Sequence, residues 1–247
     1  MIRIVRLVAI AAGLALMSQQ PGTGAVHPRV AIVFEHAGAS LDDLTPIYAM
    51  HQPFGLGIFP HQRYSGRIVR DAIAHGLTPI LHLPLEPLRP ADLGPVSGIV
   101  WTRMSGPDIA GTVEGDLGSV PGVVAVSNHA GSRATADRRV MTAVLDVVKA
   151  RGLWFEENRT TAHSVATDVA RAAGVRTVLI TTYLDDPPPG MDAKVRALVA
   201  TAVRRGWAVA AAHITTGAPQ VVARHLGEFR DAGVVFVPIT QFVSGGR

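Results

Sequence analysis

The sequence predicts a single α/β domain in which strands and helices alternate around a mostly parallel sheet or barrel. The 247 residues are 48% hydrophobic and 17% charged, so the chain can bury a full core. Short apolar runs alternate along the chain with alanine-rich amphipathic stretches. Most of these stretches end in glycine, the usual left-handed stop of a helix.

The N-terminus, residues 1–25, has the three-part form of a secretory signal peptide. Two arginines precede the apolar run of residues 7–17, and the small residues that follow end at Ala25. The run is shorter than the roughly 20 residues that cross a membrane. We therefore expect export to the periplasm or beyond, with cleavage near Ala25, leaving residues 26–247 as one domain without a transmembrane span. A buried first strand or helix is the less favoured alternative.

Eight apolar runs are predicted to be strands because they are short and rich in β-branched or aromatic residues. In chain order they are residues 29–34, 55–59, 78–83, 123–127, 153–156, 176–181, 208–213 and 234–239. Strands that are apolar on both faces are typical of parallel sheets covered by helices.

Six amphipathic stretches between these runs are predicted to be helices. They are residues 65–76, 105–120, 135–152, 162–174, 192–206 and 219–233. The Pro-rich segment 183–192 is too short for a domain linker, so we interpret it as a strand-to-helix loop.

Composition excludes several classes of function. The chain contains no cysteine, which removes a thiol nucleophile, a thiolate metal site and a disulfide framework. The formal charge of +4 comes from scattered arginines, and no nucleic-acid-binding motif is present, so we expect no nucleic-acid partner. A nucleophile elbow, a P-loop and a complete dinucleotide fingerprint are also missing.

Polar residues follow or end most of the predicted strands. The carboxyl ends of parallel strands meet on one side of a sheet or barrel, where sites are built. The residues at these positions are Glu35, His36, His61, His82, Glu86, Asn128, His129, Glu156, Glu157, Asp185, Asp186 and His213.

Three of the histidines are candidates for a metal site. His36, His82 and His129 follow three different strands and could supply the three neutral nitrogen ligands of a zinc-type site with an open position. A single strand-end histidine is more often a hydrogen-bonded loop residue, and only the repeated pattern favours a metal. Glu86, held in a stiff proline-flanked turn, could bind the same metal, orient a ligand or simply lie on the surface.

Six blocks of sequence carry a resemblance to a known family. In order they are "FEHAG", "LHLPLEP", "VPGVVAVSNHAGSRATAD", "RGLWFEENRTTAHSVA", "TYLDD" and "AAAH", between about Val30 and Val243. Together they resemble the divergent polysaccharide deacetylase family, distant relatives of the NodB-homology deacetylases. The resemblance implies a distorted (β/α) barrel, a divalent metal such as zinc, and removal of acetyl groups from a polysaccharide or peptidoglycan-type glycan.

The resemblance also implies roles for individual residues. Glu35 stands at the position of the catalytic base and His36 at that of a metal ligand, while His82 and His129 match metal-binding histidines and Glu86 falls near another. Asp185 matches an aspartate that orients the catalytic acid, His213. Residues implied to contact the substrate or support the site are Asn128, Ser132, Arg133, Glu157, Arg159 and Thr160.

The sequence departs from the family at the positions implied to hold the catalytic base and a metal ligand. The family has Asp-Asp where this chain has Glu35-His36, which replaces an anionic ligand by a neutral one. The alternative function is therefore a catalytically silent relative that binds a glycan or an envelope partner. A periplasmic binding protein is less favoured, because one barrel-like domain offers no hinge between two lobes.

Overall fold

The computed structural model of the chain describes residues 27–186 and 190–244. The predicted signal peptide lies outside the described residues. Within the described residues, no helix combines the length and the apolar character needed to cross a membrane.

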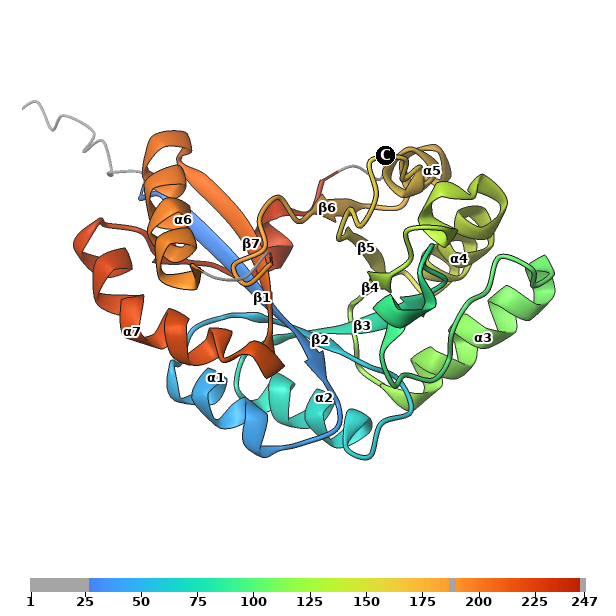
Figure 1. Cartoon of the computed structure of the whole chain (residues 1–247), viewed down its shortest axis with the longest axis horizontal. Coiled ribbons are helices and arrows are strands. Elements are labelled where there is room, and N and C mark those ends of the chain that lie inside the picture. The colour runs from blue at the N-terminus through green and yellow to red at the C-terminus, as the bar shows by residue number, and fades with distance from the viewer. Residues whose placement is uncertain (1–26, 187–189, 245–247) are drawn as a thin grey trace, which may run out of the picture.

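One sheet organises the molecule, and all its strands are parallel. The strands are β1 (Arg29–Ala37), β2 (Gly55–Ile58), β3 (Thr78–Leu85), β4 (Ala125–Ala130), β5 (Trp154–Glu157), β6 (Thr177–Leu179), β7 (Trp207–His213) and β8 (Val235–Phe236). Their order across the sheet is β6-β5-β4-β3-β2-β1-β7, and β8 also pairs with β1. The sheet curls into a half-barrel with an open side between β6 and β7 (Figure 1).

Helices cover the outside of the curled sheet (Figure 1). They are α1 (Thr45–Ala49), α2 (Ser65–Ala74), α3 (Gly106–Ser119), α4 (Arg138–Ala150), α5 (Ala166–Ala173), α6 (Met191–Arg205) and α7 (Ala218–Asp231). The expected left-handed stops are present, for example at Gly174 and Gly206, which cap α5 and α6 with φ of +74° and +78°.

Successive residues of each strand face opposite sides of the sheet, and this separates two hydrophobic clusters. In β1, Val30, Ile32 and Phe34 join the large outer cluster that the helices cover. Ala31 and Val33 face the barrel interior and belong to a smaller cluster there. Residues that continue the interior alternation toward the carboxyl ends therefore point into the mouth of the barrel.

All eight predicted strands and all six predicted helices are present, with shifted ends. The sequence analysis missed α1, which has only five residues and too little periodicity to be recognised. Strand β4 continues to Ala130, so Asn128 and His129 lie within it, not after it. The last predicted strand is reduced to the two residues of β8, because residues 239–242 form a 3-10 turn.

Candidate functional site

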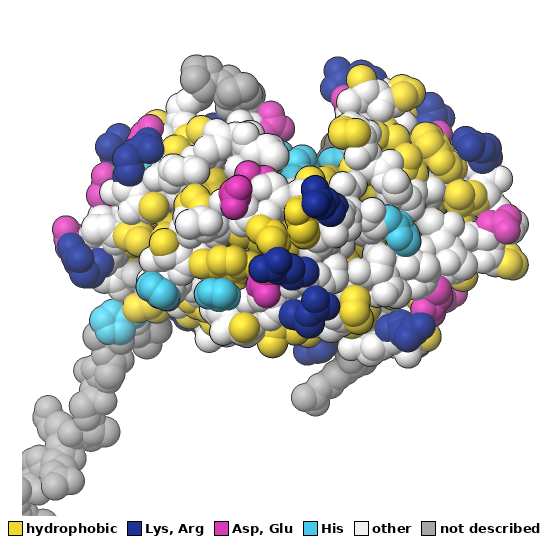
Figure 2. Space-filling view, turned by 90° about the horizontal axis from the view of Figure 1, so that it is seen from below, with side chains coloured by type: hydrophobic (Ala, Val, Ile, Leu, Met, Phe, Trp, Pro, Cys, Tyr) yellow, Lys and Arg dark blue, Asp and Glu magenta, His cyan; other side chains and the backbone are white. Residues whose placement is uncertain are grey.

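A polar cleft of about 550 Å³ lies at the carboxyl ends of the strands. It contains residues from β1, β3, β4 and β7 together with the loops that follow β3, β5 and β6. Figure 2 shows the hollow at its upper edge, with histidine side chains at the bottom. The described residues thus bring most of the predicted site residues into one place.

A backbone irregularity lets two consecutive residues of β1 serve this cleft. Glu35 continues the interior alternation and is in register with His213 of β7. The pairing of β1 with β2 shifts register between Phe34 and Ala37, and His36 has φ of +73°. A regular strand would have sent the His36 side chain to the outer face. The bulge places His36 beside Glu35 in the cleft lining.

His36, His82 and His129 come together as a group. One ring nitrogen from each of them lies within 4.8 Å of the others. His82 Nε2 and His129 Nδ1 are 3.2 Å apart, close to the roughly 3.3 Å that separates two nitrogens bound tetrahedrally to one zinc ion. The buried Nε2 of His36 has no hydrogen-bond partner among the described residues.

The opposite nitrogens of two of these rings are held by the protein. His129 Nε2 donates to the carbonyl oxygen of Leu93 over 2.9 Å, so Nδ1 of that ring presents its lone pair. His82 Nδ1 lies 2.8 Å from Ser127 Oγ, which leaves Nε2 facing the cleft. Metal-binding histidines are typically oriented in this way.

Burial also keeps the three imidazoles neutral, the form that binds metals. It lowers the pKa of His36 to about 3, with a smaller contribution from the charges of neighbouring histidines. It lowers the pKa of His82 and of His129 as well. The residues present therefore fit a divalent metal ion in both geometry and protonation.

Glu35 lies between this group and His213. Its Oε2 atom is 3.8 Å from His82 Nε2 and 3.8 Å from His213 Nε2. Asn158 Nδ2 donates to Glu35 Oε1 over 2.6 Å, and the Tyr183 hydroxyl donates to Oε2 over 3.2 Å. Burial raises the pKa of Glu35 to about 7, although the His213 charge and these two hydrogen bonds act in the opposite direction. A carboxylate with such a pKa is suited to accept a proton near neutral pH.

His213 is held by Asp185. Asp185 Oδ2 accepts from the His213 backbone N–H over 2.8 Å and lies 3.2 Å from His213 Nδ1. Thr216 Oγ1 donates to the same oxygen over 2.7 Å. Burial alone would lower the pKa of His213, but the bond to Asp185 and the charges of Glu35 and Asp185 outweigh it and raise the pKa. His213 can therefore hold a proton and release it.

Glu86 is not brought to the three histidines. Its Oε2 accepts from the backbone N–H and the hydroxyl of Thr102, each over 2.6 Å, and its Oε1 is 3.3 Å from Arg133 Nε. These bonds fasten the loop after β3 to the turn after β4. Arg133, which the resemblance assigned to substrate contact or support of the site, is thus paired with Glu86 and does not line the cleft.

Other predicted residues hold the cleft walls together. Glu157 accepts from the backbone N–H of Arg159 over 2.8 Å and from Ser164 Oγ over 2.9 Å. Asn128 Oδ1 accepts from the Asn158 N–H over 2.9 Å, and Thr160 Oγ1 donates to the Ala130 carbonyl over 2.8 Å.

Further polar residues lie at or beyond the rim. Ser132, Arg159, Thr160 and Asp186 line the cleft, and Arg159 has φ of +47°. Ser132 Oγ accepts from the Leu88 N–H over 2.9 Å. His61 lies outside the histidine group, and its Nε2 is 2.8 Å from Asp116 Oδ1 of α3.

Sequence reasoning missed several residues that complete the site. Asn158 and Tyr183 hold Glu35, Ser127 orients His82, and Thr216 holds Asp185. Strand alternation could have found Ser127, which lies two positions before His129 on the same face of β4. Tyr183 lies in a loop and Thr216 in a three-residue 3-10 helix (Ile214–Thr216), and neither is long enough for a periodic pattern to indicate side-chain direction.

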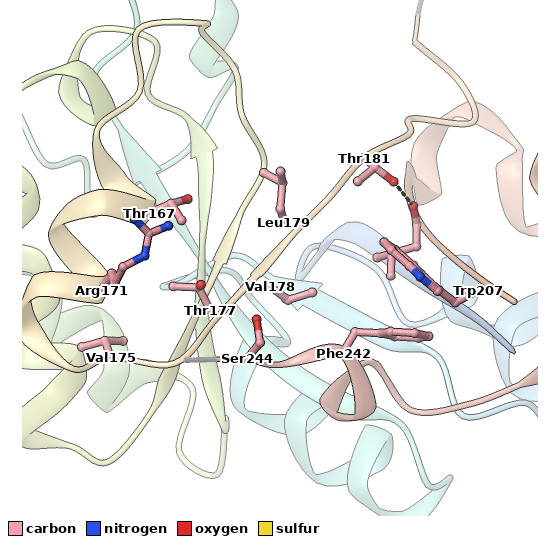
Figure 3. A pocket seen from close by; sticks show the side chains of 11 residues that line it. Thr167, Arg171, Val175, Thr177, Val178, Leu179, Thr181, Trp207, Phe242 and Ser244 are labelled. Atoms are coloured by element: carbon pink, nitrogen blue, oxygen red, sulfur yellow. Dashed lines mark hydrogen bonds between the residues drawn. The ribbon is translucent and has the colours of Figure 1, made fainter. Parts of the chain in front are cut away.

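A second cavity, of about 430 Å³, lies on the open side of the barrel between β6 and β7. Figure 3 shows its largely apolar lining, which includes Val178, Leu179, Trp207 and Phe242, with Thr181 donating to the Val209 carbonyl across the gap. None of the three clustered histidines lines it.

Known proteins resemble this chain in sequence. The model of the divergent polysaccharide deacetylase family matches residues 32–243. An uncharacterized protein of Haemophilus influenzae is 28% identical over 187 residues, which are 75% of this chain and 66% of that protein. The matched region spans about two thirds or less of the length of the curated relatives.

Solved structures share the fold. An uncharacterized protein from Agrobacterium tumefaciens superposes with a TM-score of 0.80 at 22% identity, over 90% of this chain and 91% of that one. The catalytic domain of a peptidoglycan N-acetylglucosamine deacetylase from Eubacterium rectale gives 0.53 at 13% identity, over 92% and 94%. The predicted single-domain deacetylase-type (β/α) barrel is thereby confirmed. Since the family match extends over nearly all the described residues, the chain belongs to the divergent polysaccharide deacetylase family.

Proposed function

We propose that the protein is an exported, metal-dependent hydrolase that removes acetyl groups from a polysaccharide or cell-wall glycan. The observation that carries this proposal is the convergence of three neutral imidazoles, a carboxylate of raised pKa and an aspartate-held imidazole in one cleft. Family membership and the polar character of the cleft support an acetylated glycan as the substrate.

In this proposal His36, His82 and His129 hold the metal, for which zinc is the best match to three nitrogen ligands. When bound, the ion supplies Lewis-acid activation of the acyl carbonyl and of water. Ser127 and the Leu93 carbonyl keep two of the rings in the required orientation.

Glu35 and His213 move the protons. The attacking water forms a bond from its oxygen to the acyl carbon, and Glu35 takes a proton from that water. The bond between the acyl carbon and the sugar nitrogen or oxygen then breaks, and His213 gives its proton to the leaving group. Asn158 and Tyr183 direct the Glu35 carboxylate, while Asp185 directs His213. Roles in substrate contact remain assigned to Ser132, Arg159 and Thr160 at the rim.

Acetate release tests the activity. Purified protein is incubated with acetylated chito-oligosaccharides and with peptidoglycan fragments. We expect wild type to release acetate and Glu35→Gln to lose about 100-fold or more in kcat, because general-base catalysis contributes that much. Glu228→Gln, which changes an exposed glutamate of α7, serves as the control. Glycan binding without acetate release in any metal-loaded sample would instead establish the silent alternative, which the departure at Glu35-His36 favours.

Metal analysis tests the ligand set. We expect one zinc ion per protein in wild type and loss of the metal in His82→Ala and His129→Ala. His225→Gln is the control, because His225 is also a buried histidine but lies on α7, between Asp192 and Glu228. Absence of metal from wild type after loading would contradict the proposed site.

Export is tested separately by intact-mass measurement of the secreted protein. We expect the mature chain to begin near residue 26. A secreted product that still begins at Met1 would contradict cleavage of the signal peptide.

A further inference from the structure

Glu156 is a buried carboxyl group that the proposed reaction does not use. It lies on β5, in register with Ser127 of β4 and Val178 of β6, on the face that points into the barrel interior. Its exposed fraction is 0%, and neither of its oxygens has a hydrogen-bond partner among the described residues. Burying a polar group without a hydrogen bond is costly, so a carboxyl group retained here calls for an explanation.

Asn158 and Tyr183 are the two residues that donate hydrogen bonds to Glu35. Asn158 directly follows β5 and sends its Nδ2 to Glu35, which continues the interior face of β1. Asn158 uses Nδ2 for Glu35, while its Oδ1 is buried and has no partner among the described residues. The Tyr183 hydroxyl donates to the other oxygen of Glu35, and burial, followed by the charges of Glu35 and Glu156, raises the pKa of that hydroxyl.

Glu156 and Glu35 both continue the interior face of the sheet, Glu156 on β5 and Glu35 on β1. Burial and, after it, the Glu35 charge raise the pKa of Glu156 well above its usual value. A neutral carboxyl group has one hydrogen to donate and oxygens that accept. The two carboxyl groups make no direct hydrogen bond, and a polar contact at longer range is commonly bridged by a water molecule.

We propose that Glu156 is a positioning residue for Glu35: it binds one buried water molecule, which it shares with Asn158 and Tyr183. A buried water typically makes about three hydrogen bonds, and these three polar groups can supply them. The water ties together the two donors that direct the Glu35 carboxylate. This inference rests on the proposed function, because it assigns Glu35 as the base.

The chemical test compares two substitutions of Glu156 by steady-state kinetics of acetate release. Glu156→Gln keeps polar atoms for the water and should leave kcat within about threefold of wild type. Glu156→Leu removes them and should lower kcat by about 10- to 100-fold, since a displacement of about 1 Å costs that much. KM, metal content and melting temperature should stay close to wild type. An unchanged kcat in Glu156→Leu, or an equal loss in Glu156→Gln, would overturn the proposal.

Asp116→Asn is the matched control. Asp116 is likewise a buried carboxyl group with one unpartnered oxygen, but it lies on α3 outside the barrel interior. It should leave kcat unchanged. A loss of kcat in this control equal to that of Glu156→Leu would mean that both act through general destabilisation, and would remove the support for positioning.

Crystal structures of wild type and Glu156→Leu test the positioning of Glu35 independently of the proposed activity. We expect a water molecule within hydrogen-bond distance of Glu156, Asn158 and Tyr183 in wild type, and a displaced Glu35 carboxylate in the variant. A dry interior, or an unmoved Glu35, would refute the positioning role whether or not the protein releases acetate. If the water and the displacement are seen but wild type releases no acetate, the positioning stands and the proposed function fails.

Discussion

Glu35 and His36 are neighbours in the chain, yet the backbone gives them different environments. Glu35 follows the strand alternation into the interior, where burial raises its pKa to about 7. His36 reaches the cleft only through a left-handed φ of +73°, which L-residues adopt at a cost. The same burial keeps the pKa of His36 at about 3. Two consecutive residues thus provide the proposed proton acceptor, Glu35, and a neutral imidazole, His36, for the proposed metal.

Ser127 is not one of the proposed metal ligands, but we expect its substitution to weaken metal binding because it orients one of them. Its hydroxyl lies 2.8 Å from His82 Nδ1 and fixes that ring. Ser127→Ala should weaken zinc binding by about 10- to 100-fold, measured by competition with a chelator of known affinity. Ser65→Ala removes another buried hydroxyl, one that donates to the Phe59 carbonyl, and should leave affinity unchanged. Equal affinities in the Ser127 variant and wild type would contradict this role.

At the scale of secondary-structure elements, the site is positioned by the ends of the strands and by the turns that follow them. At the end of β4 the chain turns sharply through Ala130 and Gly131, which have φ of +51° and +87°. A Cβ at Gly131 would lie 2.8 Å from Leu85 Cβ of β3. This close approach sets the loop after β4 against the end of β3, and so places His129 beside His82.

Gly131→Ala should therefore destabilise the protein more than a glycine change elsewhere. The left-handed φ costs an L-residue about 1–2 kcal/mol, and overpacking against Leu85 adds about 1–3 kcal/mol. Gly152→Ala is the matched control, because Gly152 has φ of +68° but nothing within 4 Å of the added Cβ. Urea unfolding should show the larger loss of free energy in Gly131→Ala. Equal losses would mean that the contact with Leu85 adjusts freely.

Helix α3 carries a buried carboxyl group that should make stability depend on pH. Burial raises the pKa of Asp116 from 3.8 to about 8. Because the folded state binds this proton more tightly than the unfolded state, the contribution to stability is complete below about pH 4 and is lost as pH rises through about 8. Asp116→Asn should remove this loss.

The free energy of unfolding of wild type and Asp116→Asn, measured between pH 5 and pH 9, checks this expectation. The difference in favour of the variant should grow as pH rises. A difference that shrinks with pH would show that the ring of His61, 2.8 Å from Asp116, stabilises the ionised carboxylate instead.

At the scale of the whole molecule, the proposed metal site joins distant parts of the chain. His36, His82 and His129 come from β1, β3 and β4, and Glu35 and His213 connect this group to β7. A ligand that binds only the folded state at 100 times its Kd adds about 2.7 kcal/mol to stability.

Metal removal should therefore lower the melting temperature of the protein. For a chain of this size the loss corresponds to a decrease of roughly 5–10 °C, measured by thermal unfolding with and without a chelator. His82→Ala should melt at the same temperature in both conditions. A chelator effect of the same size in His82→Ala would show that the metal stabilises the protein from another site.

The order of strands and helices could be predicted from the sequence, because hydrophobic periodicity and glycine stops are local properties. All eight strands and six of the seven α-helices of the described residues were predicted, and the five-residue α1 was missed. Because the carboxyl ends of parallel strands meet on one side of a sheet, the predicted strand order also indicated where Glu35, His82 and His129 would gather. Their roles came from the family resemblance, and their assignment as base and ligands remains the proposal made above.

The sequence by itself determined the alternation of elements, the family and the set of strand-end residues from which a site could be built. Only the tertiary structure decided which of them meet. Glu86 bonds to Thr102 and Arg133, away from the three histidines, while Asn158, Tyr183 and Ser127 join the site. The physical reason is that local patterns specify which face of a strand a residue occupies. Curvature of the sheet, the bulge at His36 and the paths of loops specify what lies opposite it.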